Sequence, residues 1–198
     1  RNVMLIEGAG WIHRPFVRDP NSRTLDEPAV PGTAIRKITA AAAAPALLAS
    51  EPRPDTIVLA QVCDIRDRVS KEFKQALMAW VAAGHKLIIQ DSDLCGHSPD
   101  YGFLPYPFKT LNPGSAGARG VAGILEDSAL LSSNPQDESY LDMKRWQDGP
   151  NDLGDSNVVI EWDNRWCGVM WARNKLQKSG FAMAYAHFGR GLIIYDGV

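Results

Sequence analysis

The chain has 198 residues, of which 45% are hydrophobic and 22% are charged, and its formal net charge is -2. These values are typical of one globular domain and give no electrostatic reason to expect nucleic acid or an anionic membrane as a partner. No apolar run approaches the roughly 20 residues that cross a bilayer, so we predict no membrane span.

The first predicted element is a buried strand over residues 2–6, which ends in the glycine turn Glu7-Gly-Ala-Gly10. This turn can approach a ligand closely, and we take Glu7 and Trp11 as ligand-binding candidates. A lone GxG is weak evidence for a nucleotide site. Residues 33–49 are rich in alanine and are predicted to be helical, with Pro45 kinking or dividing the helix.

A strand–helix–strand unit follows. Its first strand is predicted over residues 56–62 and its second over residues 86–90. Between them, Ser70 can cap a helix that Gly84 ends, and four apolar residues share one face of it: Phe73, Leu77, Trp80 and Val81. Right-handed crossovers then predict an α/β fold with a mostly parallel, flavodoxin-like sheet and flanking helices.

Residues suited to chemistry follow both strands of this unit. The first strand runs into Cys63-Asp64, and the second into Asp91-Ser-Asp-Leu-Cys-Gly-His97. Open α/β sheets place their sites beyond the carboxyl ends of such strands. Asp64, Asp91 and Asp93 could supply oxygen ligands for Ca²⁺ or Mg²⁺. We favour a role in turns for these acids, and we therefore predict no cofactor.

Aromatic residues alternate with proline from residue 99 to 108, which predicts a long, stiff loop. The loop could line a pocket with Tyr101 as a ligand-binding residue, but packing on the core is the favoured interpretation. The tryptophans could stack on sugars, and for them too we favour core packing.

The rest of the chain is predicted to be mainly strands. Short strands are expected over residues 121–125 and 158–162, and a short helical segment is expected after Cys167, through Asn174. Two apolar runs, 181–187 and 192–195, flank Phe188-Gly-Arg-Gly191 and predict a β-hairpin near the C-terminus.

The unit from Asp55 to Asp91 resembles the class I glutamine amidotransferase-like fold, particularly its trehalose-utilisation-like branch. The hairpin with Gly-Arg-Gly191 before Leu-Ile-Ile-Tyr195 is similar to the end of those domains. Active members of the family carry a cysteine nucleophile in a Gly-x-Cys-x-Gly turn, with a histidine and a glutamate near the C-terminus.

This chain departs from that pattern at two positions. Asp93 stands where the first glycine of the turn would precede Cys95, and Gly189 stands where the glutamate would follow His187. The resemblance therefore implies a degenerate member of the family. The alternative is a cysteine-dependent hydrolase in which Cys95 is the nucleophile and His187 or His97 is the base.

The patterns DSDLC, NDLGDSN and RWCG are similar to uncharacterised domains of large secreted bacterial proteins. This resemblance, with the start at Arg1 in place of an initiator Met, implies a single domain over residues 1–198 that is part of a longer exported chain. We expect a non-catalytic binding or assembly module, outside the cell or at its surface, whose partners are other domains of the same polypeptide or other protein subunits. A cytoplasmic location is the alternative.

An exported domain would tolerate a disulfide. Cys95 and Cys167 both precede a glycine in loops that could meet above the carboxyl edge of the sheet, and we predict a bridge between them. Cys63 is the competing partner because it ends the neighbouring strand.

Overall fold

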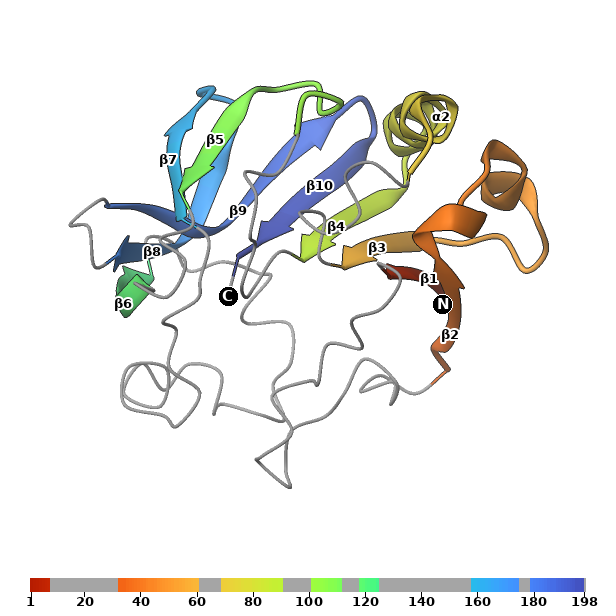
Figure 1. Ribbon diagram of the computed structural model, residues 1–198, viewed down its shortest axis with the longest axis horizontal. Coiled ribbons are helices and arrows are strands. Elements are labelled where there is room, and N and C mark those ends of the chain that lie inside the picture. The colour runs from red at the N-terminus through yellow and green to blue at the C-terminus, as the bar shows by residue number, and fades with distance from the viewer. Residues whose placement is uncertain are drawn as a thin grey trace.

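The computed structural model describes residues 1–7, 32–60, 69–90, 101–111, 118–124, 158–174 and 179–197. Within these residues ten strands form one sheet in the order β2-β1-β3-β4-β10-β9-β7-β5, with β8 paired to β9 and β6 paired to β8 (Figure 1). One α-helix, α2, and two short 3-10 helices, η1 and η2, complete the described elements. None of the described helices is long and apolar enough to cross a membrane.

Five strands make up the parallel part of the sheet: β2 (Ala34–Thr39), β1 (Asn2–Glu7), β3 (Thr56–Ala60), β4 (Lys86–Gln90) and β10 (Gly191–Asp196). Each runs parallel to its neighbour in that order. The strands predicted over residues 2–6 and 86–90 are therefore confirmed, and the strand at 56–62 is confirmed over the residues that the structure describes.

The helix α2 (Lys71–Ala82) confirms the amphipathic helix predicted from the sequence. The backbone N–H of Phe73 donates a hydrogen bond of 3.1 Å to the hydroxyl of Ser70, which is the N-cap residue. The helix buries the four apolar residues that were expected to share a face: Phe73, Leu77, Trp80 and Val81. They belong to the main core, together with side chains of the parallel strands that include Met4, Ile57, Leu87 and Ile193.

The turn between β9 and β10 closes onto the carboxyl end of α2. The backbone N–H of Arg190 donates to the carbonyl oxygen of Ala82 at 3.0 Å, and its guanidinium donates to that of Ala83 at 2.8 Å. A positive charge at this end of a helix is favoured by the helix dipole. A Cβ at Gly191 would overlap the carbonyl oxygen of Val81. The Gly-Arg-Gly sequence thus allows close backbone contact between the hairpin and the helix.

The other part of the sheet is antiparallel and contains β9 (Ser179–Phe188), β7 (Val158–Trp162), β5 (Phe108–Leu111), β8 (Cys167–Asn174) and β6 (Ala118–Ile124). The long strand β9 pairs with β10, β7 and β8, while β5 pairs with β7 and β6 with β8. The predicted C-terminal hairpin and the strand over residues 158–162 are confirmed. The sheet as a whole is mixed, with its parallel strands on one side.

The helix predicted over residues 33–49 is wrong. Residues Ala34–Thr39 form β2, which pairs with β1 along its whole length, and only the 3-10 helices η1 (Ala40–Ala42) and η2 (Pro45–Ala49) follow. The alanine run begins only at Ala40, and β2 itself contains Ile35, Ile38 and Thr39, whose β-branched side chains favour a strand. Ala44 is extended, with φ -132° and ψ 152°, as expected for a residue before proline, and the alanine run is divided there as predicted.

The helical segment predicted after Cys167 is also wrong, because residues Cys167–Asn174 form β8. This strand lies between β6 and β9 and pairs with both. Its register shifts beside Met170, so the alternation of buried and exposed residues that marks a regular strand is interrupted. Val169 and Met170 are both buried, which a strict period of two does not produce.

Candidate functional site

The carboxyl ends of the five parallel strands lie in one register row. Cα partners link Thr39, Glu7, Ala60, Gln90 and Asp196 in that order across the sheet. The pairing of β3 with β4 brings together the two strand ends from which most predicted site residues continue. Ligands of parallel α/β sheets bind beyond such an edge, so the topology places a candidate site here.

The structure describes one predicted site residue in this row, Glu7, which is the last residue of β1. The other predicted residues at this edge lie outside the described residues: Trp11, Asp64, Asp91, Asp93, Cys95 and His97. Their roles, including a Ca²⁺ or Mg²⁺ site at the three acids, stay predictions. Within the described ranges no three His, Cys, Asp or Glu residues gather as a metal site.

His187 lies at the opposite edge of the sheet. It is exposed on β9, and its Cα partner Leu192 pairs in turn with Lys86, the first residue of β4. Lys86 and Gln90 are four residues apart, which corresponds to about 13 Å along a strand. Cys95 follows the far end of β4 and lies outside the described residues. The register therefore does not bring His187 to the carboxyl edge, and its pairing with Cys95 stays a prediction.

Tyr101 is only 6% exposed and lies in the core. Its ring stacks on Phe108 with a centroid distance of 4.5 Å and meets Tyr195 edge to face at 5.9 Å. Phe108 also meets Trp166 at 5.0 Å. These contacts support the packing interpretation favoured for this loop. A ligand-binding role for Tyr101 stays a prediction.

Cys167 is the first residue of β8, and its Cα partner is Tyr185 on β9. Its thiol is partly buried and is free within the described part of the chain. Because Cys63 and Cys95 lie outside the described residues, the Cys95–Cys167 bridge stays a prediction.

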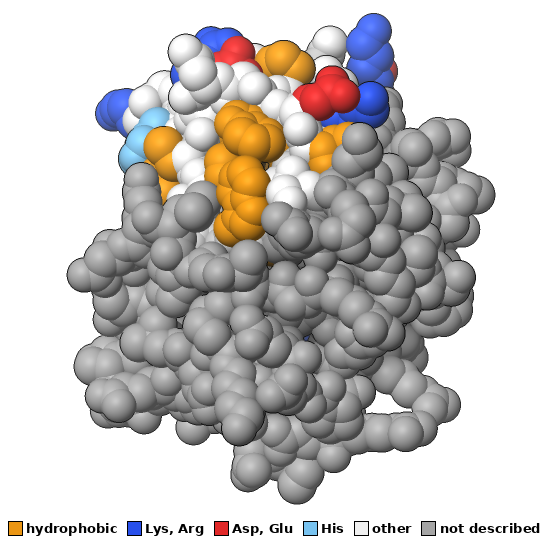
Figure 2. All heavy atoms as spheres, turned by 90° about the vertical axis from the view of Figure 1, so that its left-hand side faces the viewer, with side chains coloured by type: hydrophobic (Ala, Val, Ile, Leu, Met, Phe, Trp, Pro, Cys, Tyr) orange, Lys and Arg blue, Asp and Glu red, His pale blue; other side chains and the backbone are white. Residues whose placement is uncertain are grey.

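Three aromatic residues, Trp162, Trp171 and Phe181, form a cluster on the antiparallel part of the sheet, which we call the aromatic cluster. The Phe181 ring lies 4.3 Å from that of Trp162 and 5.5 Å from that of Trp171, and the two tryptophans meet edge to face at 6.3 Å. Phe181 is 6% exposed, but Trp162 is 38% exposed, the one large hydrophobic side chain that stands out to solvent among the described residues. Figure 2 shows hydrophobic side chains gathered on this side of the molecule.

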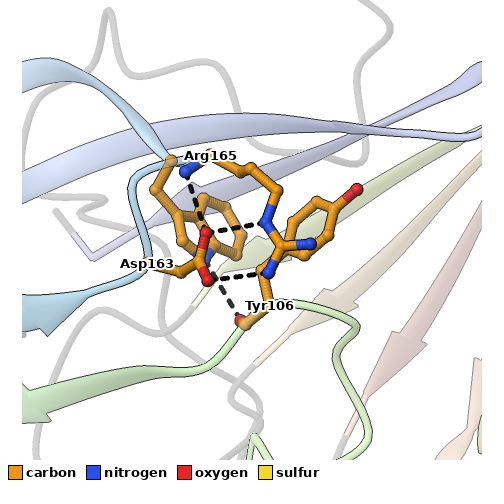
Figure 3. A network of polar contacts seen from close by, with 4 residues as sticks. Tyr106, Asp163 and Arg165 are labelled. Carbon is orange, nitrogen blue, oxygen red and sulfur yellow. Dashed lines mark hydrogen bonds and ion pairs between the residues drawn. The ribbon is translucent and has the colours of Figure 1, made fainter.

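A charged turn, cross-linked by hydrogen bonds, follows Trp162 directly (Figure 3). The Arg165 guanidinium donates two hydrogen bonds of 2.7 Å, one to each carboxylate oxygen of Asp163, and the backbone N–H of Arg165 donates a third at 3.0 Å. The guanidinium also lies 3.9 Å from the centroid of the Tyr106 ring. A bidentate pair stacked on an aromatic ring is the arrangement that holds an arginine side chain in one orientation.

The same contacts set the charges of this turn. Hydrogen bonds from the Arg165 side chain and backbone hold the pKa of Asp163 at about 2, below its ordinary value of 3.8. The hydrogen bond to Asp163 raises the pKa of Arg165. Both groups are therefore charged near neutral pH, and the turn that follows Trp162 presents a paired carboxylate and guanidinium.

The sequence interpretation missed the aromatic cluster as a surface, because it assigned the tryptophans to core packing. That assignment is correct for Trp166, which is 4% exposed and donates a hydrogen bond from its indole to the carbonyl oxygen of Tyr106 at 3.2 Å. The available signal was the run Glu-Trp-Asp-Asn-Arg from residue 161 to 165, where charges flank a tryptophan at the end of a strand. Tryptophan and arginine are enriched in protein interfaces, whereas glutamate and aspartate are depleted there, so this run alone did not identify an interaction surface.

No protein-family model and no curated protein matches the chain. Two solved structures of similar fold are STM3548, a cytoplasmic protein from Salmonella typhimurium (13% identity, TM-score 0.52), and STM1381, a cytoplasmic protein from Salmonella typhimurium LT2 (12% identity, TM-score 0.50). Each match covers 98% of this chain and 86% of the other. At these identities the similarity shows the fold alone.

The chain is also similar to part of Gan42B, a GH42 β-galactosidase from G. stearothermophilus, at 12% identity and a TM-score of 0.49. That match covers 83% of this chain and 21% of Gan42B. The chain therefore spans about a fifth of the length of that enzyme.

Proposed function

We propose that the chain is a binding or assembly module of a larger exported protein and that it acts by protein–protein interaction, without catalysis. The observation that carries the proposal is the exposed Trp162 at the end of β7. Its ring packs against Phe181 on β9 and Trp171 on β8. Under this proposal the partners are other domains of the same polypeptide or other protein subunits.

Trp162 has the properties of an interface anchor. Tryptophan, tyrosine and arginine are the residues most enriched among those that dominate binding energy. The ring contacts with Phe181 and Trp171 restrict its side chain before binding, so less conformational entropy is lost when a partner covers it. Arg165, held by Asp163 and Tyr106, is a second preordered side chain, three residues further along the chain.

The proposal includes a finer fold assignment. We infer that the parallel strands β2, β1, β3, β4 and β10, with α2 on one face, are the remnant of a flavodoxin-like sheet of the amidotransferase-like type. The hairpin that ends in β10 supports this assignment, since its Gly-Arg-Gly turn is the feature that resembled the end of those domains. The antiparallel strands are then an addition that carries the binding surface.

The interaction is tested by photo-crosslinking in the native polypeptide. A benzophenone amino acid replaces Trp162 in one variant and Leu48, on η2 in the parallel part, in the control. We expect position 162 to crosslink to one defined protein segment. Excess wild-type chain should reduce this crosslinking by competition, whereas excess chain with Trp162→Ala should not. Equal crosslinking from positions 162 and 48 would contradict the proposal.

The competing function is a hydrolase that uses Cys95 with His187 or His97. It predicts that a thiol-reactive probe labels Cys95 in the native protein and that Cys95→Ala abolishes hydrolysis of simple amides or esters, while Cys167→Ala leaves hydrolysis unchanged. We expect no hydrolysis that depends on Cys95. The position of His187 at the amino edge of the parallel strands favours this expectation.

Whether the cysteines are bridged also distinguishes an exported chain from a cytoplasmic one. An exported module is expected to contain the Cys95–Cys167 bridge, which would stabilise the fold by roughly 4 kcal/mol for a loop of about 70 residues. Three alkylatable thiols in non-reducing peptide mapping would favour the cytoplasmic alternative, the location given in the names of the two Salmonella proteins.

A further inference from the structure

The second face of the parallel strands carries an apolar cluster of its own. Leu5 on β1 and Val58 on β3 are 2% and 4% exposed, and the partly buried side chains of Val3, Ile35 and Ile88 pack against them. These residues alternate along the strands with those of the main core, to which the buried side chains of α2 belong. Among the described residues, only strands contribute to the cluster on the second face.

The order of the parallel strands indicates which connection crosses that face. In the order β2-β1-β3-β4-β10, the crossovers from β2 to β3, from β3 to β4 and from β4 to β10 all progress in one direction across the sheet. The crossover from β1 to β2 progresses in the opposite direction. Because crossovers between parallel strands are right-handed, those that progress in opposite directions lie on opposite faces of the sheet.

The three crossovers that share a direction also share a face. Ala40 lies between β2 and β3, Phe73 lies on α2 between β3 and β4, and Tyr101 lies between β4 and β10. All three residues belong to the main core cluster, on the face that α2 covers. The crossover from β1 to β2 therefore has to take the other face.

We infer that the second face of the parallel strands is an intramolecular docking surface whose occupant is the segment 8–31 of the same chain. This segment lies outside the described residues, and the inference rests on the two strands that it connects, which pair in parallel along their whole length. Its length is sufficient, because it exceeds the roughly twelve residues that a parallel crossover needs.

The composition of segment 8–31 suits an apolar surface. It contains two apolar pairs, Trp11-Ile12 and Phe16-Val17. Parallel sheets are covered on both faces, since their crossovers remove the apolar side chains of each face from water. The inference goes beyond the proposed function and is independent of it. A face that the chain covers by itself is not free to bind another domain, so the binding role stays with the aromatic cluster on the antiparallel part.

The test compares two isoleucines of β2 that lie on opposite faces of the sheet. Ile35 packs against the cluster on the second face and Ile38 against the main core, and both are partly buried. A benzophenone amino acid replaces each of them in turn in the native polypeptide, and mass spectrometry identifies the crosslinked peptides. We expect position 35 to crosslink to segment 8–31, and position 38 to crosslink to other residues of the main core and not to that segment.

Val3 on β1 provides a second position on the same face, in case the variant at position 35 does not fold, and circular dichroism verifies each variant. Crosslinks from positions 35 and 3 to another segment, such as residues 125–157, or to a separate protein would overturn the inference. Crosslinks from position 38 to segment 8–31 would overturn it as well, because the crossover would then lie on the face of α2. None of these outcomes depends on whether position 162 finds a partner.

Discussion

The parallel and antiparallel parts of the sheet are stabilised by different kinds of side chain. In the parallel part the buried residues are mainly aliphatic, as with Leu87 and Ile89 on β4, and α2 covers them. In the antiparallel part large rings pack on one another, and one of them, Trp162, extends into solvent. The parallel part forms the row of strand ends at which the candidate site lies, and the antiparallel part presents the aromatic cluster.

The two parts nevertheless share one core. Tyr195 on β10 contacts Tyr101 and Phe108, and Phe108 continues to Trp166 beside β8. Residues of both parts, including Phe73 and Phe181, belong to the same cluster of buried side chains. We therefore expect a single cooperative unfolding transition, and the predictions below test whether the two parts behave as one unit.

The largest effect is expected from truncating one phenylalanine in each part. Phe73 is a residue of α2 and is fully buried, so Phe73→Ala should lower the free energy of unfolding by about 3–5 kcal/mol. Phe181→Ala should cost less, about 1–3 kcal/mol, since its neighbour Trp162 is partly exposed and can relax into the space.

Urea unfolding followed by circular dichroism measures both losses. A single transition in each variant supports one cooperative unit. Two separate transitions in Phe181→Ala would show instead that the antiparallel part unfolds by itself.

The sequence predicted most of the parallel part because its signals are local. The capping residue Ser70, the four apolar positions of α2 and the aliphatic run before Gln90 each specify one element without reference to distant residues. β2 was missed for the opposite reason. Its six residues become a strand through the ladder with β1, a contact between residues about thirty positions apart in the chain.

The candidate site was predicted only in part. The neighbouring ends of β3 and β4 follow from the strand order, so the edge could be inferred from the sequence. The exposure of Trp162 could not be inferred in this way. Trp162 and Trp166 are only four residues apart, yet they are 38% and 4% exposed. That difference is set by the rings of β5, β8 and β9, which the sequence alone does not bring together.

Two glycines provide a matched pair of smaller perturbations. A Cβ at Gly191 would overlap the carbonyl oxygen of Val81 in α2, and a Cβ at Gly180 would overlap that of Val159 in β7. Each Gly→Ala variant should lose about 1–3 kcal/mol, because backbone has to move to accommodate the added methyl group. Gly32→Ala is the control, since nothing lies within 4 Å of its Cβ position and only its positive φ of 76° is unfavourable.

The melting temperatures of the three variants compare how tightly the backbone packs in the two parts. Losses at Gly180 and Gly191 that both exceed the loss at Gly32 support close backbone packing in both parts. A loss at Gly180 no larger than the control would mean that β7 moves away from β9 at little cost and that the antiparallel part is the softer of the two.

The smallest effect is expected at the charged turn and depends on pH. The pKa of Asp163 is depressed to about 2 in the folded chain, mainly by the hydrogen bond from Arg165, and lies near 3.8 when the chain is unfolded. The ion pair therefore stabilises the fold above about pH 3.8, and this contribution is lost as the pH falls toward 2. The difference in melting temperature between wild type and Asp163→Asn should be constant near neutral pH and shrink below pH 3.8. Glu161→Gln, which removes the exposed partner of Lys109, is the matched control. An Asp163 carboxyl that titrates in the folded protein near 3.8, followed by NMR, would show that Arg165 does not hold it and that the side chains of this turn are not preordered for binding.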